Sequence, residues 1–294
     1  MDDFQIGQNR YLPTNVRMVG IAPVNQRHLA LVVGLVAVGL PTVMLIAAFN
    51  PIYDTCFRDS ISHFYYAPFM GSFFVGALVF IGAYLIVYSG EDKHGAENRL
   101  SSWAGIFAFG VALFPTSNHG CDAATFEARA FVDFSVPAGD KVPQPMAEPN
   151  LDEFFQMIEF DLGIFVLGSD IIHYFSAALL FAFLAWFAFF VFTSVEPSQR
   201  NPDNSLKPQK ALRNRIYCIS GTIIVVSMIA MILSKILTRV FGFELAWWND
   251  GNWTFWFEAF ALWAFGFSWM VKGRFLERLE DNLDVGSDNA LPEA

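Results

Sequence analysis

Six long uncharged stretches alternate with polar segments along this chain. They cover residues 29–53, 64–90, 100–118, 174–195 and 216–234, and a sixth, 251–271, is interrupted only by Glu258. A bilayer core of about 30 Å needs about 20 helical residues, so each stretch is long enough, or nearly so, to cross it. The pattern predicts an all-α bundle of six transmembrane helices, over about residues 29–50, 68–89, 100–117, 173–194, 216–237 and 254–272.

The distribution of lysine and arginine predicts the topology of this bundle. With the N-terminus inside, 13 of the 18 basic residues fall on the cytoplasmic side. Such a bias favours cytoplasmic N- and C-termini. The prediction is a cytoplasmic arm (1–27), a membrane domain (28–273) and a cytoplasmic tail (274–294), in a bacterial inner membrane. The first stretch follows a polar arm that contains acids, and we interpret it as a span rather than a cleavable signal.

The outer loop, residues 118–170, shows two different periodicities. Apolar residues alternate with polar ones over 126–136, which predicts a short β element. Residues 151–167 change to helical spacing, with phenylalanines and leucines on one side and acids on the other. This second pattern predicts an amphipathic helix, lying either on the membrane surface or against the ends of the spans.

Composition and charge agree with a membrane protein and limit its partners. The chain is 54% hydrophobic and only 16% charged, whereas soluble domains are nearer a quarter charged. In the predicted topology the inner parts are neutral, and the outer parts carry the whole net charge of −10. That field disfavours nucleic acid and anionic lipid headgroups as partners on the outer side. Membrane lipids are expected partners, and the loop 118–170 could contact other subunits of a membrane complex.

Two of the three cysteines, Cys56 and Cys121, fall on the outer side in this topology. Each lies next to the end of a span. Disulfides persist in that compartment, so we predict that these two cysteines are bridged. Cys218 begins the fifth span and is expected to be a small buried residue.

The stretch DSISHFYYAPF, residues 59–69, leads into the second span. Pro68 fits best in the first turn of that helix, where its missing N–H costs nothing. From Pro68 to Gly90 the chain is already long enough to cross the bilayer. Residues 59–66 are therefore expected to form an ordered segment at the outer mouth of the bundle, rather than part of the span.

Polar residues predicted at the same depth suggest a site at this mouth. Glu258 is the only acid within a span, and ionisable groups in spans tend to face the bundle interior and to be functional. A structural carboxylate bonded to hydroxyl groups or to a histidine is the alternative. The predicted outer-mouth site consists of Ser60, Ser62, His63, His173 and Glu258.

Three histidines at the outer ends of spans suggest a possible metal site. His63, His119 and His173 could bind zinc, with Glu258 or Asp122 as fourth ligand or catalytic base. A metal-bound hydroxide could then attack an amide or ester at the membrane surface. No pair has HxxxH or HExxH spacing, so the site would depend on how the helices pack. Hydrogen-bonded histidines at the interface are the simpler interpretation.

Glycines are paired in two of the predicted spans. The sequences GSFFVG (71–76) and GIFAFG (105–110) place their glycines five apart. Small residues of this kind allow close helix packing, and we expect that role rather than ligand binding.

Four segments carry a resemblance to a known group. They are SISHFYYAPFMGSFFVGALVFIGAYLIVYSG, RLSSWAGIFAFGVALFPTS, HYFSAALLFAFLAWFAFFVFT and FWFEAFALWAFGFSWMVKG. Together they resemble a widespread bacterial group of six-span membrane proteins of unknown function. That group is distantly similar to the eukaryotic damage-regulated autophagy modulator (DRAM) family. The likeness covers about residues 28–273 and excludes the loop 118–170.

The match to the DRAM pattern is partial. That pattern has Ile-Ser-Asp before span two, a histidine near span four and Glu-Trp in span six. Here His63 replaces the acid, His173 matches, and Glu258-Ala259 stands in place of Glu-Trp. The resemblance implies a six-helix bundle with no established catalysis. A competing likeness is to alkaline ceramidases and adiponectin receptors, which are seven-span zinc hydrolases. This chain offers Ser60 and His63 but lacks their terminal HxxxH and their seventh span.

Three functions remain open at this point. The preferred interpretation is a non-catalytic structural or accessory subunit, or a lipid-interacting protein. The alternative is a metal-dependent membrane amidase or hydrolase that uses the histidine cluster, with zinc as the possible cofactor. The third is a carrier of a small solute or of protons, centred on Glu258, although no other charge lines the interior of the spans.

Overall fold

The computed structural model describes residues 26–50, 55–88, 96–114, 116 and 169–273, with Ile52 and four residue pairs from the loop 118–170. The described chain is mostly helical. Its long helices are α1 (Gln26–Phe49), α2 (Pro68–Val87), α3 (Ala96–Leu113), α5 (Ser169–Trp186), α6 (Pro208–Arg239) and α8 (Trp253–Lys272). Shorter helices are η2 (Ser62–Tyr66), a π-helical turn η5 (Phe187–Val191) that continues α5, η6 (Pro197–Gln199) and α7 (Ala246–Asp250).

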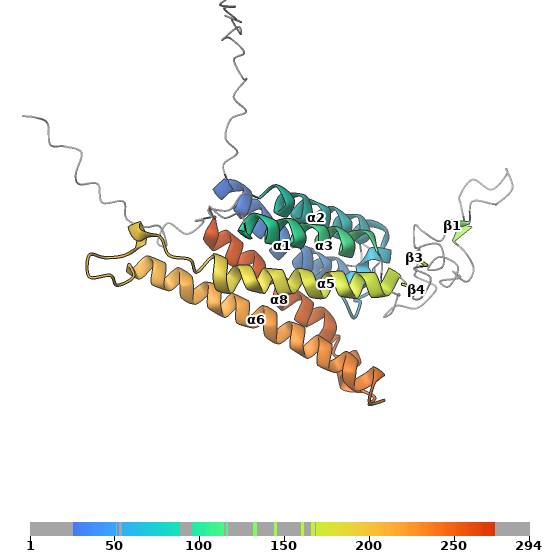
Figure 1. The fold of residues 1–294 in the computed structure, drawn as a ribbon. Helices are drawn as coiled ribbons and strands as arrows, with labels where there is room; N and C mark the ends of the chain where they lie inside the picture. The colour runs from blue at the N-terminus through green and yellow to red at the C-terminus, as the bar shows by residue number, and fades with distance from the viewer. Residues whose placement is uncertain are drawn as a thin grey trace, which may run out of the picture.

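The long helices form one bundle in which the contacts make a closed cycle (Figure 1). Helix α1 packs against α8, α8 against α6, α6 against α5, α5 against α3, α3 against α2, and α2 against α1. The first and last helices of the bundle are therefore neighbours. This contact brings the segment that follows α1 close to the start of α8.

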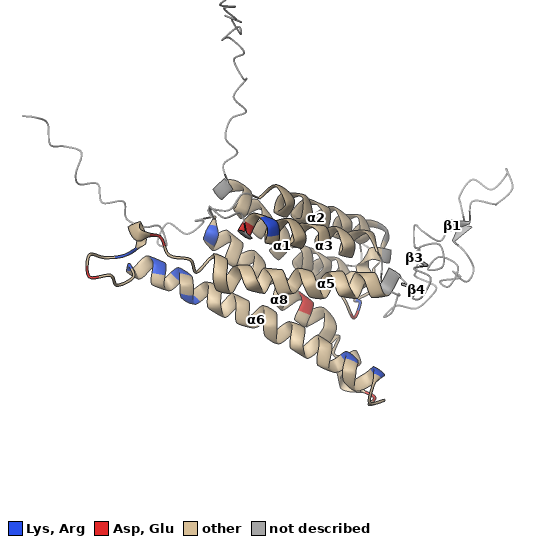
Figure 2. Cartoon of the chain, in the orientation of Figure 1, with Lys and Arg blue, Asp and Glu red and all other residues tan. Residues whose placement is uncertain are grey.

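Four helices of the described chain are long and apolar enough to cross a membrane. They contain His28–Phe49, Phe69–Val87, Ile171–Val191 and Pro208–Arg239. Large apolar side chains on these helices are exposed, as expected for contact with lipid. The other two long helices are not among these four; α3 begins with Ala-Glu-Asn-Arg, and α8 contains Glu258. Charged residues lie mostly near the helix ends and on the connector between α5 and α6 (Figure 2).

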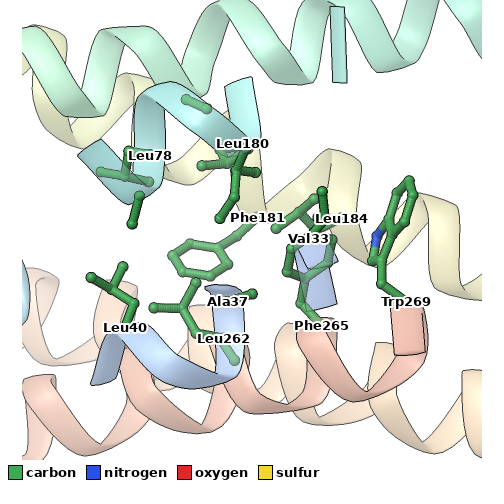
Figure 3. Packing of buried hydrophobic residues seen from close by; sticks show 14 of the residues in the cluster. Val33, Ala37, Leu40, Leu78, Leu180, Phe181, Leu184, Leu262, Phe265 and Trp269 are labelled. Carbon is green, nitrogen blue, oxygen red and sulfur yellow. The ribbon is translucent and has the colours of Figure 1, made fainter. Parts of the chain in front are cut away.

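The core lies along the axis of the bundle. Its buried side chains come from all six long helices, and those labelled in Figure 3, from α1, α2, α5 and α8, point toward one another. The labelled members are Val33, Ala37, Leu40, Leu78, Leu180, Phe181, Leu184, Leu262, Phe265 and Trp269. Burying a Leu or Phe side chain contributes about 1.5–3 kcal/mol where water is the alternative. Between lipid-embedded helices the close packing itself takes over that role.

Glycines set the closest approaches between helices. A Cβ on Gly34 of α1 would lie 2.6 Å from the carbonyl oxygen of Gly266 on α8, and the converse distance is the same. Helices α2 and α3 meet at Gly105, where a Cβ would lie 2.5 Å from the carbonyl oxygen of Gly82. Of the predicted packing glycines, Gly105 is thus tightly packed, whereas a Cβ on Gly76 would have no neighbouring atom within 4 Å.

The described pairs of the outer loop form two short antiparallel ladders. Strand β1 (Val132–Asp133) pairs with β2 (Gln144–Pro145), and β3 (Phe160–Asp161) pairs with β4 (Val166–Leu167). The amphipathic helix predicted over 151–167 is therefore wrong at the four residues of β3 and β4. Gly163 lies between these strands and disfavours a helix by about 1 kcal/mol relative to alanine. The rest of this prediction, and most of the strand predicted over 126–136, lies outside the described residues.

Candidate functional site

The segment before α2 folds against the first turn of α8. The backbone N–H of Phe255 donates to the carbonyl oxygen of Asp59 at 2.8 Å. Residues 62–66 then form the short 3-10 helix η2, and Ala67, in an extended conformation, precedes Pro68 at the start of α2. Proline at this position needs no hydrogen-bond acceptor. The segment is thus held at both ends, which fixes the side chains of residues 59–63.

Glu258 of α8 is the main partner of this segment. Its carboxylate accepts a hydrogen bond from Ser60 Oγ, which lies 2.9 Å from each oxygen, and one from the backbone N–H of Ile61 at 2.6 Å. Ser60 and Ile61 are buried, and Glu258 is half-buried. Hydrogen bonds to an ionised acceptor are shorter and stronger than neutral ones. The arrangement therefore satisfies an acid that would be costly in an apolar helix.

A second pair lies within the segment itself. His63 Nδ1 is 2.5 Å from Asp59 Oδ1, one turn earlier in the chain. The His63 side chain is buried, and that of Asp59 is 30% exposed. A carboxylate at one ring nitrogen fixes the orientation and tautomer of an imidazole, as in the pairs that activate a catalytic base.

His173 of α5 joins the segment to the end of α3. Its Nδ1 lies 2.7 Å from the carbonyl oxygen of Phe114, and its Nε2 lies 2.9 Å from Ser62 Oγ. A carbonyl oxygen only accepts, so Nδ1 carries the proton, and Ser62 donates its hydroxyl hydrogen to Nε2. Both His173 and Ser62 are buried. The backbone N–H of Ser62 also donates to Ser60 Oγ at 3.1 Å, which links this network to that of Glu258.

A polar cavity of about 80 Å³ opens beside Glu258. Its walls come from the segment before α2 and from α5, α6, α7 and α8. We call this feature the polar cavity; it is lined by Asp59, Ser60, His63, Tyr174, Ser234, Lys235, Thr238, Trp248, Asn249, Thr254 and Glu258. A space of this size holds a few water molecules or a small polar group.

The α6 and α7 walls of the polar cavity contribute hydrogen-bond donors. Lys235 Nζ lies 5.8 Å from the centre of the Tyr174 ring, a cation–π distance, and Lys235 makes no salt bridge within the described part of the chain. Trp248 donates its indole N–H to Thr254 Oγ1 at 2.9 Å. Asn249 adds a side-chain amide from α7.

Two ionisable groups flank the site outside the long helices. Burial lowers the pKa of Arg58, and the neighbouring carboxylate of Asp59 opposes that shift. The Arg58 guanidinium lies 5.9 Å from the centre of the Phe64 ring. Burial also raises the pKa of the Tyr65 hydroxyl. These shifts indicate that both side chains pack within the segment before α2 rather than face water.

The structure brings together the five residues predicted for the mouth site. Hydrogen bonds join Ser60 to Glu258, Ser62 to His173, and the Ser62 N–H to Ser60. His63 lies beside this network and is hydrogen-bonded to Asp59. His119, Asp122 and Cys121 lie outside the described residues. The zinc site and the Cys56–Cys121 bridge therefore stay predictions. The burial predicted for Cys218 is wrong, because its side chain is exposed on α6.

The described histidines do not favour zinc binding. Both ring nitrogens of His173 are already hydrogen-bonded, so it has no nitrogen left to ligate a metal. Among the residues that the structure describes, no three metal-binding side chains form a group. His63 in turn directs Nδ1 to Asp59.

Sequence reasoning missed the wall of the polar cavity that α6 and α7 provide. Tyr174, Asn249 and Trp248 carry no signal that would separate them from ordinary interfacial residues. Lys235 does carry one, because it is the first cation after the uncharged stretch 216–234, and the sequence alone makes it, like Arg239, a candidate partner of Glu258. In comparisons of the whole chain, no protein-family model, no curated protein and no solved structure matches it.

Proposed function

We propose that this chain is a six-span integral membrane protein that binds the polar headgroup of a membrane lipid in its polar cavity, without catalysing a reaction. The observation that carries the proposal is the cavity itself, which combines charges of both signs with hydroxyl and amide groups at one end of the bundle. Binding sites are typically concave, with a few convergent polar groups.

The proposal includes a membrane topology for the chain. Helices α3 and α8 complete six spans with the four apolar helices, and both termini are cytoplasmic. The polar cavity then faces the outer side of a bacterial inner membrane, near the acidic loop 118–170. A bridge between Cys56 and Cys121 would tie this loop to the segment before α2. The loop would be the contact surface for any other subunits, and the distant DRAM-type resemblance fits this non-catalytic role.

Two threonines of α6 allow a controlled test. Thr238 lines the polar cavity and Thr222 does not, yet each donates its hydroxyl to the carbonyl oxygen four residues earlier, at 2.9 and 2.8 Å. Thr238→Trp places an indole in the cavity, and Thr222→Trp places one on the exposed face of the same helix. Lipid that remains with the purified protein is quantified by mass spectrometry. We expect Thr238→Trp to lose it and Thr222→Trp to keep it; equal retention would exclude the cavity as the binding site.

The Asp59–His63 pair favours a second candidate, a hydrolase in which His63 acts as general base toward a water molecule in the cavity. A base oriented by a carboxylate is the usual arrangement for that role. Purified protein incubated with phospholipid vesicles would then release fatty acid or a headgroup at a rate that His63→Ala abolishes. Absence of turnover with lipid still bound would leave the binding function.

A further inference from the structure

Glu258 and Lys235 line the same cavity but do not form a salt bridge with each other. Lys235 has no salt bridge within the described residues, and the carboxylate of Glu258 is hydrogen-bonded to Ser60 and Ile61. Two opposite charges that share a small cavity without meeting leave a space that a ligand with both charges can fill. The hydrogen bonds that Glu258 and Lys235 can still form therefore indicate which chemical groups the ligand carries.

The carboxylate of Glu258 has unused acceptor capacity. It receives one hydrogen from Ser60, shared by both oxygens, and one from Ile61. A carboxylate can accept about four hydrogen bonds. A half-buried anion with unfilled acceptor sites is best complemented by a cationic donor, and a primary ammonium group supplies three N–H bonds.

The α6 and α7 side of the polar cavity offers hydrogen-bond donors, so it requires a ligand group that accepts hydrogen bonds. The ammonium group of Lys235 has three donors, and its described contact is the face of the Tyr174 ring. The Asn249 side chain makes no hydrogen bond in the described part of the chain, and the Thr254 hydroxyl accepts from Trp248, which leaves its own hydrogen to donate. Three donors on this side suit an anion with several oxygens, such as a phosphate.

The surroundings of the cavity are apolar where acyl chains would lie. Ile232, Leu233 and Ile236 are exposed on α6 beside Lys235, and Ile171 and Phe175 are exposed on α5 beside Tyr174. Figure 1 shows that α6 diverges from α5 toward the α7 end of the bundle. In a membrane these faces contact lipid, so a headgroup can enter the polar cavity while its chains stay along α5 and α6.

We infer that the polar cavity is selective for an aminoalkyl phosphate, the headgroup chemistry of phosphatidylethanolamine, with the ammonium at Glu258 and the phosphate at Lys235, Asn249 and Thr254. This inference rests on the proposed headgroup-binding function. It predicts that phosphatidylethanolamine is preferred to phosphatidylcholine, whose quaternary ammonium has no N–H to donate. It also predicts preference over phosphatidylglycerol, which lacks the cation that Glu258 requires.

The test uses the full chain, delipidated and reconstituted with vesicles of equal parts phosphatidylethanolamine, phosphatidylcholine and phosphatidylglycerol. Retained lipids are counted after purification. We expect at least about tenfold enrichment of phosphatidylethanolamine, the effect of one charge-assisted hydrogen bond. Lys235→Met should lower the retention of every lipid, and Asn249→Ala should lower it less. Glu258→Gln removes the anion that the ammonium contacts, and should lower the retention of phosphatidylethanolamine to the level of phosphatidylglycerol.

The outcomes separate the two proposals. Enrichment of phosphatidylglycerol or phosphatidylcholine that Thr238→Trp abolishes would overturn the aminoalkyl phosphate inference and keep headgroup binding. Lipid retention that is absent, or equal in Thr238→Trp and Thr222→Trp, would overturn headgroup binding itself. Free phosphoethanolamine is the second possible source of this chemistry. If millimolar phosphoethanolamine displaces the retained lipid, the site is assigned to the soluble compound. If it does not displace the lipid, the site is assigned to the lipid.

Discussion

The contact between α1 and α8 allows a stability prediction with an internal control. Gly34 and Gly39 lie on the same helix, but a Cβ at Gly34 would be 2.6 Å from the Gly266 carbonyl oxygen, whereas one at Gly39 would have no atom within 4 Å. Gly→Ala raises helix propensity by about 0.5–1 kcal/mol at either position, so this gain cancels when the two variants are compared.

The remaining difference is the cost of overpacking. Ordinary contact begins at 3.4 Å, so Gly34→Ala must move the backbones of α1 and α8 apart by about 0.8 Å. A gap of 0.5–1 Å forfeits about a quarter to a half of each dispersion contact. Overpacking of this kind costs about 1–3 kcal/mol. We therefore expect Gly34→Ala to be less stable than Gly39→Ala by that amount.

Unfolding in mixed micelles with increasing dodecyl sulfate measures this difference, with helicity as the signal. Gly266→Ala should reproduce the effect from the other helix, because its Cβ would lie 2.6 Å from the Gly34 carbonyl oxygen. Equal unfolding free energies for Gly34→Ala and Gly39→Ala would refute the close approach of α1 and α8, and with it the position of α8 beside the segment before α2.

Substitutions at Glu258, His173 and Lys210 probe the polar contacts. Glu258→Leu leaves the Ile61 N–H without its acceptor and should cost about 1–3 kcal/mol in the free energy of unfolding, while Glu258→Gln keeps an oxygen and should cost less. His173→Phe should destabilise by a similar amount, since the buried Ser62 hydroxyl loses its acceptor, and Ser62→Ala in the same background should recover part of the loss. Lys210→Met removes the buried ammonium that donates to the carbonyl oxygen of Phe192, just after η5, at 3.1 Å. It should lower stability by about 0.5–2 kcal/mol, detected as faster hydrogen exchange at the end of α5.

The helices could be predicted because an uncharged run of about 20 residues has few alternatives to a buried or lipid-facing helix. Their ends are less predictable. Helix α6 begins at Pro208, eight residues before the predicted span, and includes the charged residues Lys210 and Arg213, both of which are buried. Charges in a sequence usually indicate contact with solvent, whereas Lys210 in fact caps the carbonyl of Phe192.

The mouth residues on the 59–63 segment could be predicted because Pro68 separates that segment from the span that follows. The opposite wall of the cavity could not. It depends on how far α6 continues toward Arg239 and on the turn of α7, which brings Trp248 and Asn249 back toward α8. No periodicity in the sequence encodes that return. Asn252, with a φ of 50°, marks the turn between α7 and α8 in the structure, since asparagine tolerates the left-handed region better than most residues.

The segment and α8 depend on one another, which explains why an acid is kept in this helix. The backbone of Asp59 accepts from the first turn of α8, and Glu258, one turn later, accepts from Ser60 and Ile61. These contacts run in opposite directions, so neither element can shift alone without leaving a buried polar group unpaired. A hydrophobic residue in place of Glu258 would suit an apolar helix but would release the segment, and with it one wall of the polar cavity. The free-energy cost of burying this carboxylate is therefore offset by the hydrogen bonds that hold Ser60 and Ile61 in place beside the polar cavity.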